Sequence, residues 1–239
     1  MTVKRGIPVE LSHIKLTRAA IQVTSPYAVA SLTSEMQNPV HVLTRSERTM
    51  KRAFDIVFSL LILILTFPLF IVIAIAVKVD SRGSIIFRQT RVGQHERRFT
   101  MYKFRSMVEN ADEIVSPSHA GEYLKRPDDP RVTRIGRILR RTSLDELPQF
   151  FNVLIGDMSV VGPRPEVLWI AEQYEPWQQL RTTVPQGITG WWQVTGRAAN
   201  PLQNNVKFDL YYIRHYSFWF DLRIVAMTPL CVLTGYGAY

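Results

Sequence analysis

Residues 56–77 read IVFSLLILILTFPLFIVIAIAV, and the interpretation of the whole 239-residue chain depends on this stretch. It is the only run of this length without a charged residue, and its 22 residues are enough to enter a lipid bilayer, which takes about 20 apolar residues to span. A multi-pass membrane protein is therefore not expected. A secretory signal peptide is not expected either, because the first 50 residues contain no compact apolar segment.

The run is either a single spanning helix or a helix that enters the membrane, breaks and returns to the same side. Pro68 lies near its middle, and a proline inside a helix removes one hydrogen bond and costs about 3 kcal/mol. The Thr66 hydroxyl could cover a freed carbonyl group. Short flanks rich in Lys and Arg tend to remain cytoplasmic, and both flanks follow this tendency only if they lie on one face. These residues are Arg45, Arg48, Lys51 and Arg52 before the run, and Lys78, Arg82, Arg88, Arg91, Arg97 and Arg98 after it.

The overall composition is that of an ordinary globular protein, with 46% hydrophobic and 21% charged residues. The single cysteine, Cys231, excludes an internal disulfide and a cysteine-based zinc or iron–sulfur site. The net charge of +9 raises the possibility of nucleic-acid binding, but no zinc-finger spacing, RNA-recognition sequence or basic zipper is present. Phosphate groups of lipids and nucleotides account for the charge better.

Several secondary-structure elements are expected outside the apolar run. Apolar and β-branched stretches around Gly93 predict a β-hairpin over residues 84–106. The C-terminal segment contains Trp219 with aromatic neighbours, which fits a helix in the membrane interface, although an ordinary core helix is the alternative. Helices are expected over residues 107–115, 133–141, 165–183 and 204–215, and a Gly-rich loop over 184–197.

Asp145 and Glu146 are the first candidates for chemistry, in the stretch SLDELPQ that begins at Ser143. Ser143 and Glu146 have the spacing of a helix capping box, so a purely structural role is one interpretation. The other is a nucleophile beside a metal ligand. A carboxylate can attack phosphorus and form an acyl phosphate. Oxygen ligands without His or Cys favour Mg²⁺.

Arginines supply candidate phosphate-binding groups. Pro163 and Pro165 stiffen the backbone around Arg164, which suits bidentate phosphate recognition, although an exposed arginine in a tight turn would look the same. The stretch GITGWWQVTGR ends at Arg197, and its glycines could bring the backbone close to a phosphate or could serve packing. Arginines spaced about three residues apart indicate a solvated or membrane-facing basic surface: Arg131, Arg134, Arg137, Arg140 and Arg141.

These pieces occur in one order, and from about Lys51 to Tyr239 the chain resembles the bacterial polyprenyl-phosphate phosphoglycosyl transferases of the monotopic type, or bacterial sugar transferases. The resemblance covers about four-fifths of the chain. The matching stretches are KRAFDIVFSLLILILTFPLF, FRQTRVG, YKFRSM, LRRTSLDELPQFFNVLIGDMSVVGPRP, GITGWWQVTGR and GYGAY. The DELPQ…GDMSVVGPRP block is highly specific to this family.

The resemblance implies an enzyme that moves a sugar 1-phosphate from a UDP-sugar to undecaprenyl phosphate and releases UMP, as the first membrane step of exopolysaccharide or other surface-glycan assembly. It implies a mainly α fold with small β-hairpin elements (α+β), and a re-entrant helix over residues 54–78 that breaks at Pro68. The implied site residues are Asp145 as nucleophile and Mg²⁺ ligand, Glu146 as its partner carboxylate, and Arg140, Arg164 and Arg197 in phosphate binding.

On this interpretation the chain has three parts: a loosely ordered extension (1–48), a re-entrant membrane hairpin (49–80) and a cytosolic catalytic domain with an interfacial C-terminal helix (81–239). The implied location is the cytosolic face of the bacterial inner membrane. The expected partners are a UDP-sugar, undecaprenyl phosphate and membrane lipid, without nucleic acid. Neither the sugar, for which glucose or galactose is the working assumption, nor the oligomeric state follows from the sequence.

The chain departs from the family pattern at two places. Pro185 and Gln186 stand where the family often has Lys-Pro, so a basic residue is missing. Phe67 precedes Pro68 where Ser-Pro is usual. Two alternatives to the implied reaction scheme stay open: direct attack by the lipid phosphate in a ternary complex, and a non-catalytic membrane-surface scaffold for glycan-assembly enzymes.

Overall fold

The computed structural model describes residues 43–111, 129–195 and 205–234, so residues 1–42 of the expected extension and Arg197 lie outside the described residues. The described part is mostly helical with a few short strands, which confirms the expected fold class. The helices are α2 (Arg45–Asp80), α5 (Arg134–Thr142), α6 (Gln149–Ile155), α7 (Leu168–Ala171), α8 (Pro176–Gln179), α9 (Trp191–Thr195), α10 (Asn205–Arg214) and α11 (Phe218–Thr234). The strands are β1 (Ile86–Val92), β2 (Arg98–Phe104), β3 (Ser159–Val161), β4 (Glu166–Val167) and β5 (Gly187–Thr189), and short 3-10 turns are η2 (Gln94–Glu96), η4 (Leu144–Glu146) and η5 (Leu180–Thr182).

Helix α2 begins earlier than the apolar run because its N-terminus is capped. The Thr44 side chain accepts a hydrogen bond from the Glu47 backbone, and the Glu47 carboxylate accepts one from the Thr44 backbone at 2.8 Å. This capping box satisfies backbone N–H groups that a helix start leaves unpaired. The helix therefore starts at Arg45, inside the segment that was expected to be a loose extension.

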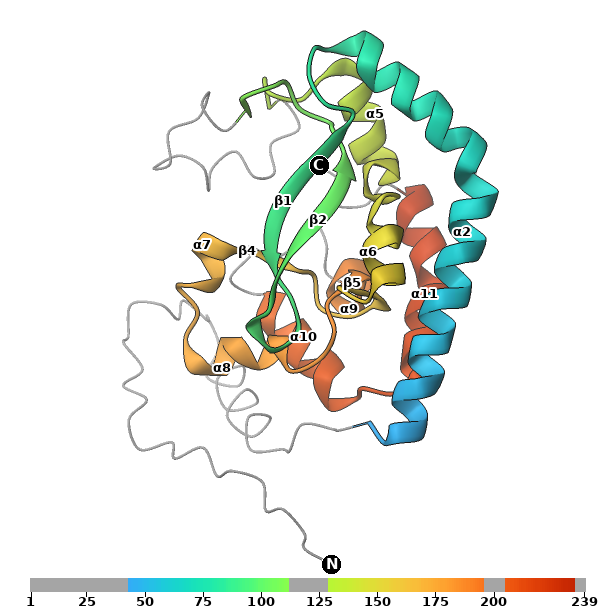
Figure 1. Cartoon of the computed structure of the whole chain (residues 1–239). Coiled ribbons are helices and arrows are strands. Elements are labelled where there is room, and N and C mark those ends of the chain that lie inside the picture. Colours follow the sequence, from blue (N-terminus) through green and yellow to red (C-terminus); the bar gives the residue numbers. More distant parts are fainter. Residues whose placement is uncertain (1–42, 112–128, 196–204, 235–239) are drawn as a thin grey trace, which may run out of the picture. The chain divides into compact units, whose positions relative to one another are not determined.

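Helix α2 continues through Pro68 to Asp80. The Thr66 hydroxyl donates to the Ile62 carbonyl at 2.7 Å. Pro68 has no N–H to donate to the Ile64 carbonyl, so this hydrogen bond does not replace the one that the proline removes. A proline and a threonine bonded to its own preceding turn each favour a bend. Figure 1 shows α2 running beside α6 and α11 and then curving over the end of the domain near α5.

The apolar segment of α2 is exposed rather than part of a core. In the described part of the chain it is the one helix long and apolar enough to cross a membrane, and only 11% of its most apolar window is buried. A core helix of a soluble protein would be mostly buried. The exposed large apolar side chains of this segment are Val57, Leu60, Leu61, Ile64, Leu65, Phe67, Leu69, Ile71, Val72 and Ile75.

Both ends of α2 are fixed to the same folded body. Near its start, Lys51 and Asp55 are buried against β3. Near its end, Ile73 and Val77 pack with Phe104 in a second apolar cluster. The Arg105 guanidinium also donates to the carbonyl groups of Val77, Ser81 and Arg82, which lie in or just after the last turn of the helix. The folded domain thus binds α2 both before and after its exposed apolar segment.

The expected β-hairpin is confirmed. Strands β1 and β2 are antiparallel, with Val92 opposite Arg98, and His95 takes a positive φ in the connecting turn. Strand β4 extends this sheet by pairing with β1. A second, parallel pair joins β3 to β5 through Ser159 opposite Gly187 and Val161 opposite Thr189.

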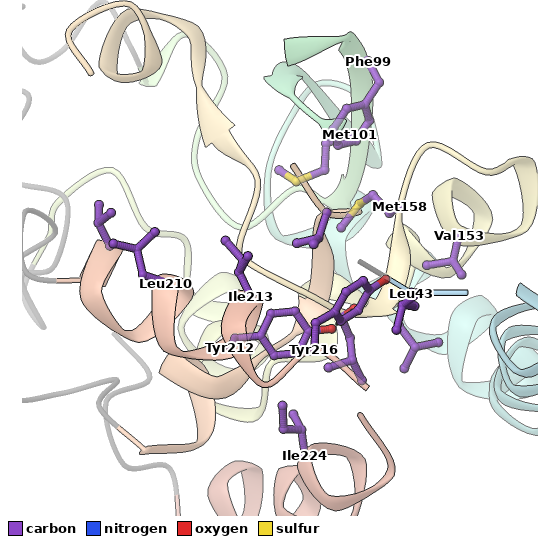
Figure 2. Close-up of a cluster of buried hydrophobic side chains, with 14 residues drawn as sticks. Leu43, Phe99, Met101, Val153, Met158, Leu210, Tyr212, Ile213, Tyr216 and Ile224 are labelled. Carbon is purple, nitrogen blue, oxygen red and sulfur yellow. The ribbon is translucent and has the colours of Figure 1, made fainter. Parts of the chain in front are cut away.

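The main core is built by side chains from the hairpin, α6, β3, α10 and α11 and from the segment just before α2. Figure 2 shows Met101, Met158, Tyr212 and Tyr216 within this cluster. The Tyr212 and Tyr216 rings are 5.4 Å apart. Burying such side chains stabilises the fold by about 2 kcal/mol each, which fixes the elements that carry the site. The helix expected over 204–215 is confirmed as α10.

Two secondary-structure predictions were wrong. The helix expected over residues 165–183 is divided into β4, α7, α8 and η5, because Glu166 pairs with β1 and Glu175 takes an extended backbone ahead of Pro176. Residues 107–110 are not helical, since Met107 forms a β-bridge with Val132, and residues 112–115 of the expected helix lie outside the described residues. The Gly-rich segment contains a strand and a short helix, β5 and α9.

Candidate active site

The acidic pair lies on the short turn η4, directly after α5. Helix α5 ends because Ser143 adopts a left-handed backbone (φ 56°, ψ 18°), which turns the chain before Leu144. The Ser143 side chain makes no capping hydrogen bond there, so the capping box that its spacing allows is not formed. The Glu146 carboxylate contacts side chains from other elements.

Glu146 is held by two basic residues from distant parts of the chain. Its Oε1 accepts from Arg164 Nη2 at 2.7 Å and from Lys103 Nζ at 3.2 Å. Lys103 comes from β2, and Arg164 comes from the loop between β3 and β4. Charge-assisted hydrogen bonds of this kind are stronger than neutral ones. The structure thus brings together Glu146 and Arg164, two of the expected site residues, and adds Lys103.

Asp145 is buried but not paired. The residue is only 8% exposed, and among the described residues no hydrogen bond holds its carboxylate. Its pKa is raised to about 6, chiefly because burial deprives a charged carboxylate of hydration. The charge of Lys103 opposes this rise in pKa, Glu146 adds to it, and Arg164 and Arg140 also oppose it. A carboxylate that is desolvated, surrounded by cations and free of hydrogen bonds is suited to act as a nucleophile.

The backbone around Arg164 is fixed by hydrogen bonds to three successive carbonyl groups. Gly187 N donates to the Pro163 carbonyl at 2.8 Å. Arg181 Nη2 donates to the Arg164 carbonyl at 2.9 Å, and Arg91 Nη1 donates to the Pro165 carbonyl at 3.2 Å. Arg181 is itself buried between Glu166 and Asp209. The guanidinium of Arg164 is therefore carried by a rigid loop.

The glycines of the GITG stretch serve this loop. A Cβ atom on Gly187 would collide with the Gly162 backbone, and one on Gly190 would collide with the Gly162 carbonyl. The close approach lets Gly162 N donate to the Thr189 carbonyl at 2.9 Å. Gln186, where the family often has Pro, is buried and donates to the Arg181 and Val184 carbonyls. This segment therefore supports the loop that carries Arg164.

The remaining arginines divide into different roles. Arg140 is close enough to Asp145 for its charge to lower the Asp145 pKa. Arg131 does not belong to a basic surface as expected, because it is buried in an ion pair with Asp129 at 2.8 Å. The expected contribution of Arg197 lies outside the described residues.

Lys103 is the site residue that sequence reasoning missed. On β2 it occupies the same alternate positions as the buried Phe99 and Met101. Burial lowers its pKa, and the charge of Glu146 raises it. A lysine at the alternation of a strand that buries Phe99 and Met101 is a detectable signal, because burying an unpaired ammonium group is costly. The YKFRSM stretch contained this signal, but only the fold places it beside Glu146.

Among the described residues no group of three or more His, Cys, Asp or Glu side chains forms a ready-made metal site. Asp145 and Glu146 nevertheless fit Mg²⁺, which binds proteins through one or two carboxylates and takes its other ligands from substrate phosphates and water. The unpaired carboxylate of Asp145 is the group with free acceptor capacity.

Comparison with known proteins gives a consistent result. The family model described as bacterial sugar transferase matches residues 46–235. The chain is 45% identical over 206 residues to a UDP-glucose:undecaprenyl-phosphate glucose-1-phosphate transferase of Escherichia coli (strain K12), covering 82% of this chain and 43% of that protein. It is 43% identical over 204 residues to an undecaprenyl-phosphate galactose phosphotransferase of Salmonella typhimurium, covering 82% and 43%.

A galactosyl transferase CpsE of Streptococcus agalactiae is 38% identical over 234 residues, which covers 95% of this chain and 51% of that protein. The chain therefore spans about half the length of the curated relatives that it matches. Because the family model covers most of the chain, including the apolar helix, the acidic pair and the Arg164 loop, the chain belongs to the bacterial sugar transferase family.

Proposed function

We propose that this chain transfers a sugar 1-phosphate from a UDP-sugar to undecaprenyl phosphate, giving undecaprenyl diphosphate sugar and UMP. The observation that carries the proposal is the unpaired, buried Asp145 carboxylate beside Glu146, Lys103 and Arg164. The names of the relatives supply the donor and acceptor classes, and glucose and galactose both occur among them.

Two steps account for the chemistry. The Asp145 carboxylate attacks the phosphorus that carries the sugar, the phosphoanhydride bond to UMP breaks, and a phosphosugar ester forms on Asp145. An oxygen of undecaprenyl phosphate then attacks the same phosphorus and releases the Asp145 carboxylate. Arg164 and Arg140 stabilise the negative charge that develops as UMP leaves. Glu146, itself paired with Lys103, holds Arg164 in position.

Mg²⁺ held by Asp145 would neutralise the diphosphate and help UMP to leave. The chain's own part is to keep the Asp145 carboxylate desolvated and the guanidinium groups aimed at the phosphates.

The membrane arrangement that we propose is re-entrant, with both ends of α2 at the cytosolic face of the bacterial inner membrane and a bend at Pro68. It is supported by the fixing of both ends of α2 to one folded body, because a straight spanning helix separates its ends by about 30 Å of hydrocarbon. The side chain of Trp219 at the start of α11 is 76% exposed, which suits a position at the membrane–water interface.

This topology predicts the labelling of two flanking positions. Ser46→Cys and Ser84→Cys, each made in a Cys231→Ser background, lie before and after the apolar segment. A membrane-impermeant maleimide is expected to label both in inverted membrane vesicles and neither in intact spheroplasts. Labelling of one position in intact spheroplasts would instead indicate a spanning helix.

The raised pKa of Asp145 predicts a pH dependence. The carboxylate must be ionised to attack, so kcat/KM for the donor is expected to fall about tenfold per pH unit as the pH drops below about 6, where the free enzyme's Asp145 titrates. The profile of kcat/KM between about pH 5 and pH 8 measures this. A profile that stays flat through this range would contradict the assignment.

A donor screen tests the proposed function itself. The purified chain is mixed with undecaprenyl phosphate, Mg²⁺ and one UDP-sugar at a time, and released UMP is measured. At least one donor, with UDP-glucose and UDP-galactose the first to try, is expected to give UMP together with a lipid-linked product. UMP release with none of the UDP-hexoses or their N-acetyl forms would favour the non-catalytic scaffold.

A further inference from the structure

Helix α2 carries a buried polar stripe on the side opposite its exposed apolar residues. Lys51, Asp55 and Ser59 follow one another at four-residue spacing, so they lie on one face of the helix. Lys51 and Asp55 are each only 4% exposed. Burying charged groups is costly unless they are paired, so their partners indicate what this face of the helix does.

The partners of Asp55 and Lys51 include groups of one short strand, β3. Asp55 Oδ1 accepts from Val160 N at 2.9 Å and from the Ser159 hydroxyl at 3.0 Å. Lys51 Nζ donates to the Val161 carbonyl at 3.0 Å. Strand β3 pairs with β5 on one side, and on the other it is held by these two side chains of the membrane helix.

Lys51 is in turn fixed from the C-terminal part of the chain. Its ammonium group pairs with Asp221 of α11 at 2.5 Å, and the Tyr212 hydroxyl donates to the same carboxylate at 2.6 Å. The charge of Lys51 is thus compensated, and its remaining hydrogen-bonding capacity is directed to the Val161 carbonyl.

Strand β3 leads directly into the loop that carries Arg164. Only Gly162 and Pro163 separate Val161 from Arg164, and proline fixes the backbone φ angle at that point. A displacement of β3 is therefore passed on to the Arg164 guanidinium, which contacts Glu146 at 2.7 Å.

We propose that Asp55 and Lys51 are positioning residues for Arg164, so that the membrane helix sets the geometry of the phosphate-binding arginine. The inference deepens the proposed function and rests on it. It means that α2 is part of the substrate-binding machinery as well as an anchor. Displacing a binding group by about 1 Å can lower the rate about 100-fold, which sets the scale of the expected effect.

The test is a double-mutant cycle between Asp55 and Arg164, with kcat/KM for the UDP-sugar as the readout. Asp55→Ala is expected to lower kcat/KM about 100-fold in the wild-type chain but less than about threefold in an Arg164→Ala background, because the group that it positions is already gone. A residue that only stabilises the fold would lower kcat/KM equally in both backgrounds.

Two further variants sharpen the result. Asp55→Asn keeps an oxygen that accepts from Val160 N and the Ser159 hydroxyl, so its kcat/KM is expected within about threefold of wild type. Arg52→Gln is the matched control on the same helix, since Arg52 donates to the Val153 and Leu154 carbonyls at the end of α6 and does not contact β3. The kcat/KM of Arg52→Gln is expected within about threefold of wild type. A 100-fold loss would show that any loosening of α2 lowers activity and would contradict a specific role for Asp55.

If Asp55→Ala does not fold, the same cycle is run with Lys51→Met combined with Asp221→Asn. This double change removes both charges of the buried Lys51–Asp221 ion pair together. Equal losses in the two Arg164 backgrounds, or a loss for Asp55→Asn as large as for Asp55→Ala, would overturn the inference. A wild-type chain that releases no UMP would instead overturn the proposed function. A wild-type chain that is active but shows no coupling between the sites would overturn this inference alone.

Discussion

Asp145→Asn is expected to lower turnover by about 10⁴-fold or more, the scale seen when a single member of a nucleophilic unit is removed. The amide cannot form an ester with phosphorus, while its size and shape are nearly those of the carboxylate. UMP release with the best donor and undecaprenyl phosphate measures the loss. The structural reason is that Asp145, unlike Glu146, has a carboxylate that no hydrogen bond holds among the described residues.

The same variant is expected to be at least as stable as the wild type. The Asp145 pKa is raised from 3.8 to about 6 in the folded chain, so the unfolded chain loses this proton more readily. Stability from this group therefore falls as the pH rises from the unfolded to the folded pKa, and at neutral pH the ionised carboxylate costs the fold on the order of 3 kcal/mol. Asparagine removes this cost.

Thermal unfolding at neutral pH, in detergent or nanodiscs, supplies the control for that experiment. The variant's Tm is expected to equal or exceed that of the wild type. An inactive variant with a markedly lower Tm would show that Asp145 supports the fold, and a variant that keeps a tenth of the activity would remove Asp145 from the role of nucleophile.

Arg164→Lys is expected to lower kcat/KM for the UDP-sugar by about 10²- to 10³-fold, although it keeps the charge. A lysine offers a point charge on a flexible chain, whereas the guanidinium can donate to Glu146 with one nitrogen and present the others to a phosphate in a fixed plane. The loop that carries Arg164 is fixed by Gly187, Arg181 and Arg91, so the lysine cannot be brought closer by a local rearrangement.

Arg137→Lys is the matched control for this prediction. Arg137 lies exposed on α5, and it is not among the charged groups that shift the Asp145 pKa. Its conservative replacement is expected to leave kcat/KM within about twofold of wild type. If Arg164→Lys behaves like Arg137→Lys, charge alone is sufficient at this position and the bidentate role is wrong.

The parts of this fold that depend on local patterns could be predicted from the sequence. The apolar run, the hairpin around Gly93 and the acidic pair each depend on a short segment whose composition decides the outcome. The prediction of a single helix over 165–183 was wrong because a tertiary contact outweighs local propensity. Pairing of Glu166 with β1 holds the backbone extended where the local sequence favours a helix.

The assembly of the site could be predicted only in part. Lys103 is 43 positions away from Glu146, and no local pattern shows that β2 ends beside η4. The polar stripe of α2 could be detected, because Lys51 and Asp55 are charged residues at four-residue spacing beside a membrane segment, where charges are rare without a partner. Its target, strand β3, is more than a hundred positions away and required the fold.

The most direct test of the account is intact-protein mass spectrometry of the wild-type chain after incubation with a turnover-competent UDP-sugar and Mg²⁺ in the absence of undecaprenyl phosphate. A mass increase equal to one sugar phosphate is expected on the peptide that contains Asp145. It is expected to be absent from Asp145→Asn and to disappear when undecaprenyl phosphate is added. An unmodified protein under conditions in which the complete mixture releases UMP would contradict this expectation, and would indicate direct attack by the lipid phosphate instead.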